Sequence, residues 1–150
     1  MIYADPSFLF SFYAWDDNTA AAQRLYQRDQ RRPLIFTPWQ RFELRNAIRL
    51  VTHRLKRAKS PIRFQSGNVF REIEADLSAG RLKHREHDWL ETIRLADDLS
   101  SKHTELLGSA AVDVWHVAVA ILLEADAFWT FDEDQQVLAR ATGKFGTVAG

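Results

Sequence analysis

The sequence contains no cysteine. This absence excludes disulfide bonds, thiolate zinc sites and cysteine nucleophiles, and it suits a reducing cytoplasm. Any metal ion bound by this chain must therefore use oxygen or imidazole ligands.

Long apolar runs are also missing, and no stretch is long and apolar enough to cross a bilayer. The first residues, Met1 to Asp5, lack the basic region and the apolar run of a signal peptide. We therefore expect a cytoplasmic protein.

The chain carries no excess of charge, because 20 Lys and Arg side chains balance 20 Asp and Glu side chains. The total thus gives no indication of a nucleic-acid partner, and such a partner must be argued from local clusters. The length of 150 residues is that of one ordinary domain, so we expect a single domain over residues 1–150.

Short apolar runs alternate along the chain with longer segments of helical periodicity. The apolar runs predict strands, with 81–83 and 145–148 as edge strands and the others at 1–4, 34–36 and 127–130. The periodic segments predict helices at 8–15, 19–28, 37–57, 69–79, 87–102, 110–124 and 132–140. Strands alternating with helices imply right-handed crossovers, so we expect a three-layer α/β domain with a mostly parallel sheet.

Four carboxylates fall where such a fold gathers ligands, at the carboxyl ends of its strands. Asp5 and Asp132 each follow a predicted strand, and Glu43 lies in the second turn of the helix after the strand 34–36. Asp113 lies near the start of the helix 110–124, whose following residues are almost wholly apolar. A carboxylate in a buried helix needs a partner, and magnesium is a suitable one because it prefers oxygen ligands.

Each acid also has a simpler interpretation. Asp5 and Asp132 precede helices and could be N-caps. Glu43 could pair with Arg41 or Arg45, and Asp113 could favour the helix N-terminus electrostatically. The coincidence of all four on one predicted edge favours the metal site.

Four segments, in this order and spacing, resemble PIN-domain ribonucleases, especially VapC-like toxins of type II toxin–antitoxin systems. They are Tyr3-Ala4-Asp5-Pro6-Ser7, Phe42-Glu43-Leu44, Val112-Asp113-Val114-Trp115-His116-Val117-Ala118 and Phe128-Trp129-Thr130-Phe131-Asp132. The resemblance runs from Met1 to about Ala141, and its most specific part is the segment Asp113 to His116 followed by Thr130-Phe131-Asp132.

The resemblance implies a five-stranded parallel sheet, an RNA substrate and one or two Mg²⁺ or Mn²⁺ ions. It assigns the ions to Asp5, Glu43, Asp113 and Asp132. It assigns hydrogen-bonding support to Ser7 and Thr130, and it also implies a cognate antitoxin and a homodimer.

Three positions qualify this assignment. Related chains often carry a basic residue where this chain has Ala110-Ala111, and Asp134 offers a second candidate for the fourth acid. His116 lies three residues after Asp113, on the same helical face, so it could assist the site or bind metal. We favour a packed histidine with a structural hydrogen bond.

A basic stretch from Arg41 to Arg63 contains Glu43 as its only acid. Within it Arg41, Arg45 and Arg49 are spaced four apart and should line one helical face. This stripe could guide an RNA backbone toward the metal, be a merely solvated face, or dock an acidic partner segment. The five tryptophans are expected in the core or at interfaces rather than as base-stacking platforms.

Three functions compete. The first is an endoribonuclease toxin in which metal-activated water cuts a phosphodiester. The second, a phosphatase or phospho-receiver, would require Asp-x-Asp after the first strand, where this chain has Asp5-Pro6-Ser7. The third is a non-catalytic module that keeps the PIN fold and binds RNA or protein.

Overall fold

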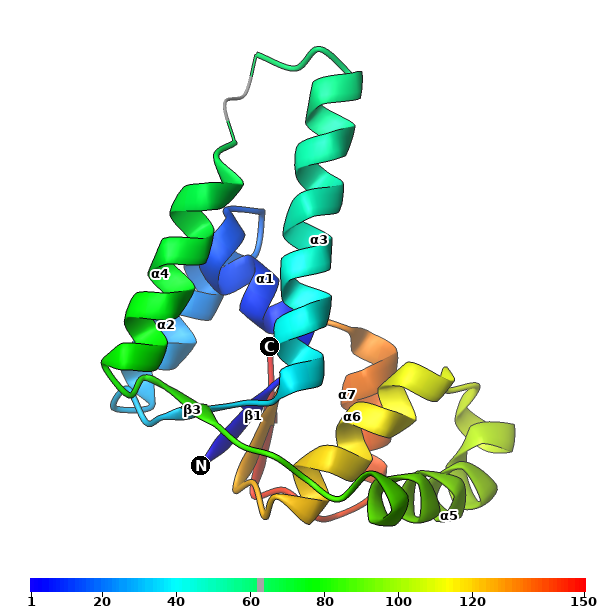
Figure 1. Ribbon diagram of the computed structural model, residues 1–150. Helices are drawn as coiled ribbons and strands as arrows, with labels where there is room; N and C mark the ends of the chain where they lie inside the picture. The colour runs from blue at the N-terminus through cyan, green and yellow to red at the C-terminus, as the bar shows by residue number, and fades with distance from the viewer. Residues whose placement is uncertain (62–63) are drawn as a thin grey trace.

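The computed structural model describes residues 1–61 and 64–150 (Figure 1). Its strands are β1 (Ile2–Ala4), β2 (Leu34–Phe36), β3 (Leu82–His84), β4 (Ala127–Trp129) and β5 (Thr147–Ala149). Its helices are α1 (Pro6–Ala14), α2 (Thr19–Arg28), α3 (Pro38–Arg57), α4 (Ser66–Ser78), α5 (Trp89–Leu107), α6 (Ala111–Leu122) and α7 (Glu133–Ala141).

The strands form one five-stranded sheet in the order β3-β2-β1-β4-β5. Every pairing is parallel, which confirms the predicted sheet and places β3 and β5 at its edges as expected. The central strand β1 pairs with both β2 and β4. Strands from the two ends of the chain therefore end side by side.

Two hydrophobic layers sandwich the sheet. On one face Ala4, Phe36 and Trp129 pack against α1 to α4, and on the other Tyr3, Ile35 and Phe128 pack against α5 to α7. The alternation along each strand produces this division, because successive side chains point to opposite faces. The result is the predicted three-layer α/β domain.

Local signals explain where the helices begin and end. Thr37 caps α3 through a capping box with Gln40, and proline follows at the first helical position, as predicted. The helix α5 continues five residues beyond the predicted end at Lys102, because Gly108 provides the left-handed conformation that ends it. Among the described helices, none is long and apolar enough to span a membrane.

Candidate functional site

The pairing of β1 with β4 determines the geometry of the carboxyl edge. The backbone N–H of Asp5 donates to the carbonyl of Trp129 at 2.9 Å, so the residues that follow both strands are neighbours. Asp5 leads into α1, and Asp132 begins α7. The structure therefore brings together acids that lie far apart in sequence.

Asp5 is almost fully buried, at 4% exposed. Its Oδ1 accepts hydrogen bonds from the Phe8 N–H at 2.9 Å and from the Ser7 hydroxyl at 2.7 Å, so Asp5 is indeed an N-cap. Burial raises the pKa of this carboxyl, and the two hydrogen bonds offset part of that rise. Both hydrogen-bond donors to Asp5 are uncharged, so a bound cation would still stabilise its charged carboxylate.

Ser7 and Thr130 join the ends of β1 and β4. Their hydroxyl oxygens lie 3.2 Å apart, and the Ser7 Oγ accepts from the Phe131 N–H at 3.1 Å. The Thr130 hydroxyl accepts from the Asp132 N–H at 3.0 Å. This network holds the loop that carries Asp132 against the start of α1.

Glu43 points from α3 toward α6. Its Oε2 lies 3.0 Å from His116 Nε2, at ion-pair distance, but this buried oxygen has no hydrogen-bond partner of good geometry among the described residues. The other ring nitrogen of His116, Nδ1, lies 2.8 Å from the Tyr3 hydroxyl. His116 is thus packed between a strand and a helix, and it links β1 to Glu43.

Asp113 lies in the first turn of α6, as predicted, where a negative charge also favours the helix N-terminus. Burial raises the pKa of this carboxyl, and the charge of Asp132 raises it further, with a smaller contribution from Asp134. Its Oδ1 accepts a 3.4 Å hydrogen bond from Gln135 Nε2. Of the two candidates for a fourth acid, Asp132 therefore acts more strongly on Asp113.

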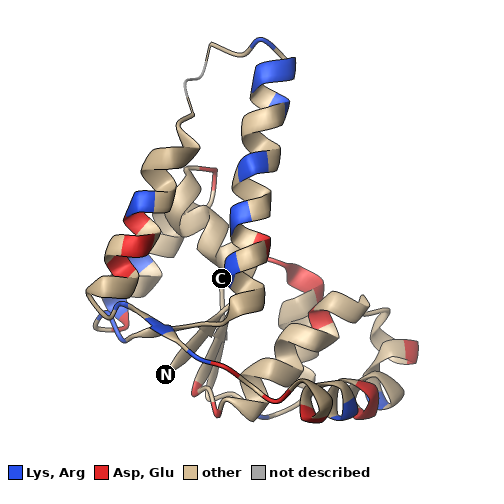
Figure 2. Ribbon diagram, viewed as in Figure 1, with Lys and Arg blue, Asp and Glu red and all other residues tan. Residues whose placement is uncertain are grey.

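We call these four residues, Asp5, Glu43, Asp113 and Asp132, the acidic edge. A cavity of about 570 Å³ opens beside it between α1, α3 and the loop after β4, with Ser7, Glu43 and Asp132 in its lining. Figure 2 shows acidic residues where that loop enters α7 and near the start of α6. Glu43 and Asp132 thus face a space large enough for part of a polymeric substrate.

Within residues 1–61 and 64–150, no three acids or histidines form a ready-made metal cluster. Glu43 turns toward His116, and Asp5 and Asp132 cap helices. The donor chemistry nevertheless suits magnesium, which is usually held by one or two carboxylates and several waters. Burial raises the pKa of Asp5 and of Asp113, and a Glu43 oxygen is buried without a hydrogen-bond partner among the described residues, so a cation at this edge would stabilise the charged carboxylates.

The arginine stripe has a different position from the one that the sequence suggested. Arg41 forms an ion pair with Glu74 of α4 at 2.5 Å, and the guanidinium groups of Arg45 and Arg49 lie over the Phe70 ring. Glu43 is two residues from Arg41, which is about 200° around the helix. The stripe therefore faces α4 and points away from Glu43. Figure 2 shows the basic residues along α3, and Arg63 lies outside the described residues.

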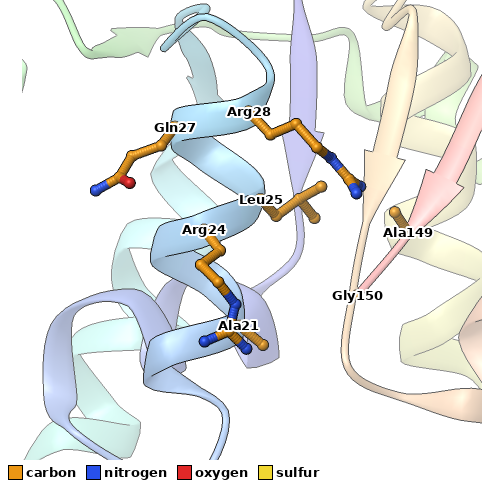
Figure 3. Close-up of a pocket in the computed structure, with 7 residues that line it drawn as sticks. All are labelled: Ala21, Arg24, Leu25, Gln27, Arg28, Ala149 and Gly150. Atoms are coloured by element: carbon orange, nitrogen blue, oxygen red, sulfur yellow. The ribbon is translucent and has the colours of Figure 1, made fainter.

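A larger hollow lies elsewhere, between α2 and the end of β5, with a volume of about 660 Å³. Figure 3 shows Arg28 extending from α2 toward Ala149, and no Asp or Glu side chain is among the lining residues. Size alone therefore does not identify the site, because this hollow offers no carboxylate side chain to a cation.

Two residues of the site were not identified from the sequence. Tyr3 lies two positions before Asp5, so the strand alternation that puts them on one face was an available signal. Gln135 lies three positions after the capping residue Asp132, the spacing of a capping box. Their contacts with His116 and Asp113, in contrast, depend on tertiary packing.

The chain was also compared with known proteins. It matches the family described as PIN domain over residues 2–141, nearly its whole length. No curated protein matches it.

Proposed function

The chain belongs to the PIN-domain family, whose members are mostly metal-dependent nucleases, and from this premise we propose that it is a magnesium- or manganese-dependent endoribonuclease. The observation that carries the proposal is the acidic edge. Its four carboxylates come from separate parts of the sequence and have no Lys or Arg ion-pair partner among the described residues, and two of them, Glu43 and Asp132, line one cavity.

In this proposal each residue has a definite task. The buried Asp5 and the half-buried Asp113 would hold the ion through their carboxylates, and Glu43 and Asp132 would complete the oxygen ligands. When bound, the ion would polarise a water and offset the negative charge that develops on the phosphodiester. Ser7 and Thr130 keep the loop that carries Asp132 close to Asp5. His116 would orient the Glu43 carboxylate through the oxygen that faces α6.

The first test is cleavage of single-stranded and structured RNA by the purified full chain. Chelator should stop cleavage, and Mg²⁺ or Mn²⁺ should restore it. The matched control is Asp98→Asn, because Asp98 is an exposed acid paired with Lys102 on α5, and it should cut normally. Rescue by zinc alone would contradict an all-oxygen site.

We further propose that the chain is the toxin of a toxin–antitoxin pair. The support is the resemblance of its motifs to VapC-like toxins together with the family match. Expression of the wild-type chain alone should arrest bacterial growth, Asp113→Asn should not, and a co-expressed cognate antitoxin should relieve the arrest. Harmless expression of the wild-type chain at a high level would instead favour the non-catalytic binding module.

A further inference from the structure

The hollow between α2 and the end of β5 is basic, and we call it the arginine hollow. Among the described residues, it is lined by part of α2 and by two residues at the end of the chain: Ala21, Arg24, Leu25, Gln27, Arg28, Ala149 and Gly150. The charged side chains in this set are those of Arg24 and Arg28. The arginine hollow therefore suits an anion rather than a cation.

Arg24 and Arg28 have no counter-charge in the described part of the chain. Both side chains are exposed, and neither forms a hydrogen bond or an ion pair there. The acid next to Arg28, Asp29, is paired with Arg32 at 2.7 Å instead. Because Arg24 and Arg28 are four residues apart on one helix, their like charges destabilise it. An anion bound between them would remove this cost.

The two arginines reach different parts of the hollow. Figure 3 shows Arg28 extending toward Ala149 and Arg24 extending along α2 toward Ala21. Long side chains in helices lean toward the helix N-terminus, which explains the direction of Arg24. The other end of α2 leads to the amino end of β2, so its N-terminal turns lie toward the carboxyl edge of the sheet. Arg24 therefore points toward the edge that carries the acids.

The loop after β4 joins the arginine hollow to the acidic edge. The Thr130 N–H donates to the Ala149 carbonyl at 2.9 Å, and a side chain at position 150 would collide with the Thr130 carbonyl. The Thr130 hydroxyl accepts from the Asp132 N–H, which belongs to the acidic edge. Since β5 is two strands away from β1, the β5 wall of the hollow lies roughly 10 Å from Asp5.

We propose that Arg24 and Arg28 bind a phosphate of the RNA substrate other than the one that is cleaved, on the β5 side of the acidic edge. This inference rests on the proposed ribonuclease function, because it takes RNA as the polymer that reaches the acids. A strand that leaves the acids over β4 and β5 brings its next phosphates to the arginine hollow. Guanidinium groups match phosphate oxygens in geometry as well as in charge. Arg24 and Arg28 are thus positioning residues.

The lining of the arginine hollow favours RNA over an acidic protein segment. The core of a protein interface is apolar and rich in aromatic residues, whereas Arg24, Gln27 and Arg28 surround Leu25 here and no aromatic side chain is among the described lining residues. Contacts with phosphates carry no sequence information. The arginine hollow should therefore add affinity for RNA of any sequence.

The test is the binding of a labelled single-stranded RNA to the full chain, followed by fluorescence anisotropy over a range of salt, with chelator present to prevent cleavage. The variant carries Arg24→Gln and Arg28→Gln together, because glutamine nearly preserves helix propensity and removes only charge. Loss of one phosphate contact should lower the log–log salt slope by roughly 0.7 and weaken binding about 10-fold at about 50 mM salt.

The matched control carries Arg94→Gln and Lys144→Gln, and it also loses two exposed positive charges. Arg94 lies on α5, on the other face of the sheet, and Lys144 precedes β5 at the amino edge. This control should bind RNA with nearly the affinity and slope of the wild type. A neutral methylphosphonate, moved along the RNA one linkage at a time, should weaken binding to the wild type at the contacted linkage. It should have no effect there on the double variant.

Three readouts separate this proposal from the nuclease function. The double variant should bind Mn²⁺ like the wild type and raise KM for cleavage with little change in kcat. A wild type that binds RNA but cuts none with Mg²⁺ or Mn²⁺ would overturn the nuclease function alone.

The arginine hollow would be overturned by a double variant with the RNA affinity and salt slope of the wild type, or by a control that weakens binding equally. Unchanged RNA affinity with a lost affinity for an oligoglutamate peptide would overturn it in favour of a protein partner. A wild type that binds no RNA would overturn both proposals.

Discussion

Buried carboxylates occur in two regions of this protein, and their surroundings differ. Asp76, near the end of α4, accepts a hydrogen bond from the Tyr13 hydroxyl at 2.7 Å and one from Arg81 Nε at 2.7 Å. The acidic edge has no such guanidinium partner among the described residues, and its contacts come from uncharged groups and one histidine. Asp76 thus has its counter-charge within the fold.

We propose that this difference separates structural acids from functional ones. A buried charge is tolerated when it is paired and hydrogen-bonded, as Asp76 is. Burial is the chief cause that raises the pKa of Asp5 and of Asp113, and neither acid has a Lys or Arg partner among the described residues. We therefore expect substitutions in the two regions to have opposite consequences for stability and for activity.

The largest effect should follow from Asp5→Asn and Asp113→Asn. An amide is an uncharged and weaker ligand for magnesium, so RNA cleavage by each variant should fall by more than about 100-fold. Loss of a residue that only supports a metal ligand costs up to about 100-fold, and loss of a ligand should cost more. Single-turnover cleavage with equal protein and metal concentrations measures this. Normal cleavage by Asp113→Asn would remove Asp113 from the site.

The next effect concerns His116, which lies between Tyr3 and Glu43. His116→Leu removes both contacts, so the affinity for Mn²⁺ should fall about 10- to 100-fold, as for other residues that orient metal ligands. His116→Gln has both a donor and an acceptor and should recover part of the affinity. If the leucine and glutamine variants bind Mn²⁺ as tightly as the wild type, His116 serves packing alone.

Asp76→Asn provides the opposite case. The loss of charge weakens the contact with Arg81, and because Arg81 is half exposed we expect a cost of about 1–3 kcal/mol in the free energy of unfolding. The melting temperature should fall by several degrees while metal affinity stays unchanged. Thermal melts with a parallel metal titration test both statements. A changed metal affinity would contradict the distinction between the two regions.

The smallest effect should be a gain in stability. Because the pKa of Asp113 is raised in the folded state, its ionisation opposes folding, and this penalty grows as pH rises through the raised pKa and is absent below the unfolded value. Without metal, Asp113→Asn should therefore melt up to about 2–4 °C higher than the wild type at pH 7. This shift corresponds to a gain of at most about 1 kcal/mol in the free energy of unfolding, because Asp113 is partly solvated. At pH 3 the two proteins should melt alike.

Much of the fold was predictable because local signals and tertiary packing agree. The strand 34–36 and the helices 19–28 and 37–57 have clear periodicity and breaks, and the observed elements match them closely. The edge strands β3 and β5 were also expected, although each has only three residues. Binary patterning and turn chemistry were sufficient here.

The site was predictable only in part. The carboxyl ends of parallel strands are a topological rule, so the convergence of Asp5 and Asp132 followed once β1 and β4 were neighbours. The position of the arginine stripe was not predictable. Sequence spacing shows which residues share a helical face, but not which element covers that face, and here Glu74 and Phe70 of α4 cover it. The contacts of Trp89 with Trp39 and Trp115 were not predictable for the same reason, since they join three helices that are distant in sequence.

The most direct test of the acidic edge is a calorimetric titration of the full chain with Mn²⁺ and Mg²⁺ at neutral pH, with Asp113→Asn and Asp76→Asn in parallel. Wild type and Asp76→Asn should bind metal with the same affinity, because Asp76 pairs with Arg81 away from the acidic edge. Asp113→Asn should show little or no binding. Metal binding that is absent from the wild type, or unchanged in Asp113→Asn, would contradict a metal site at the acidic edge.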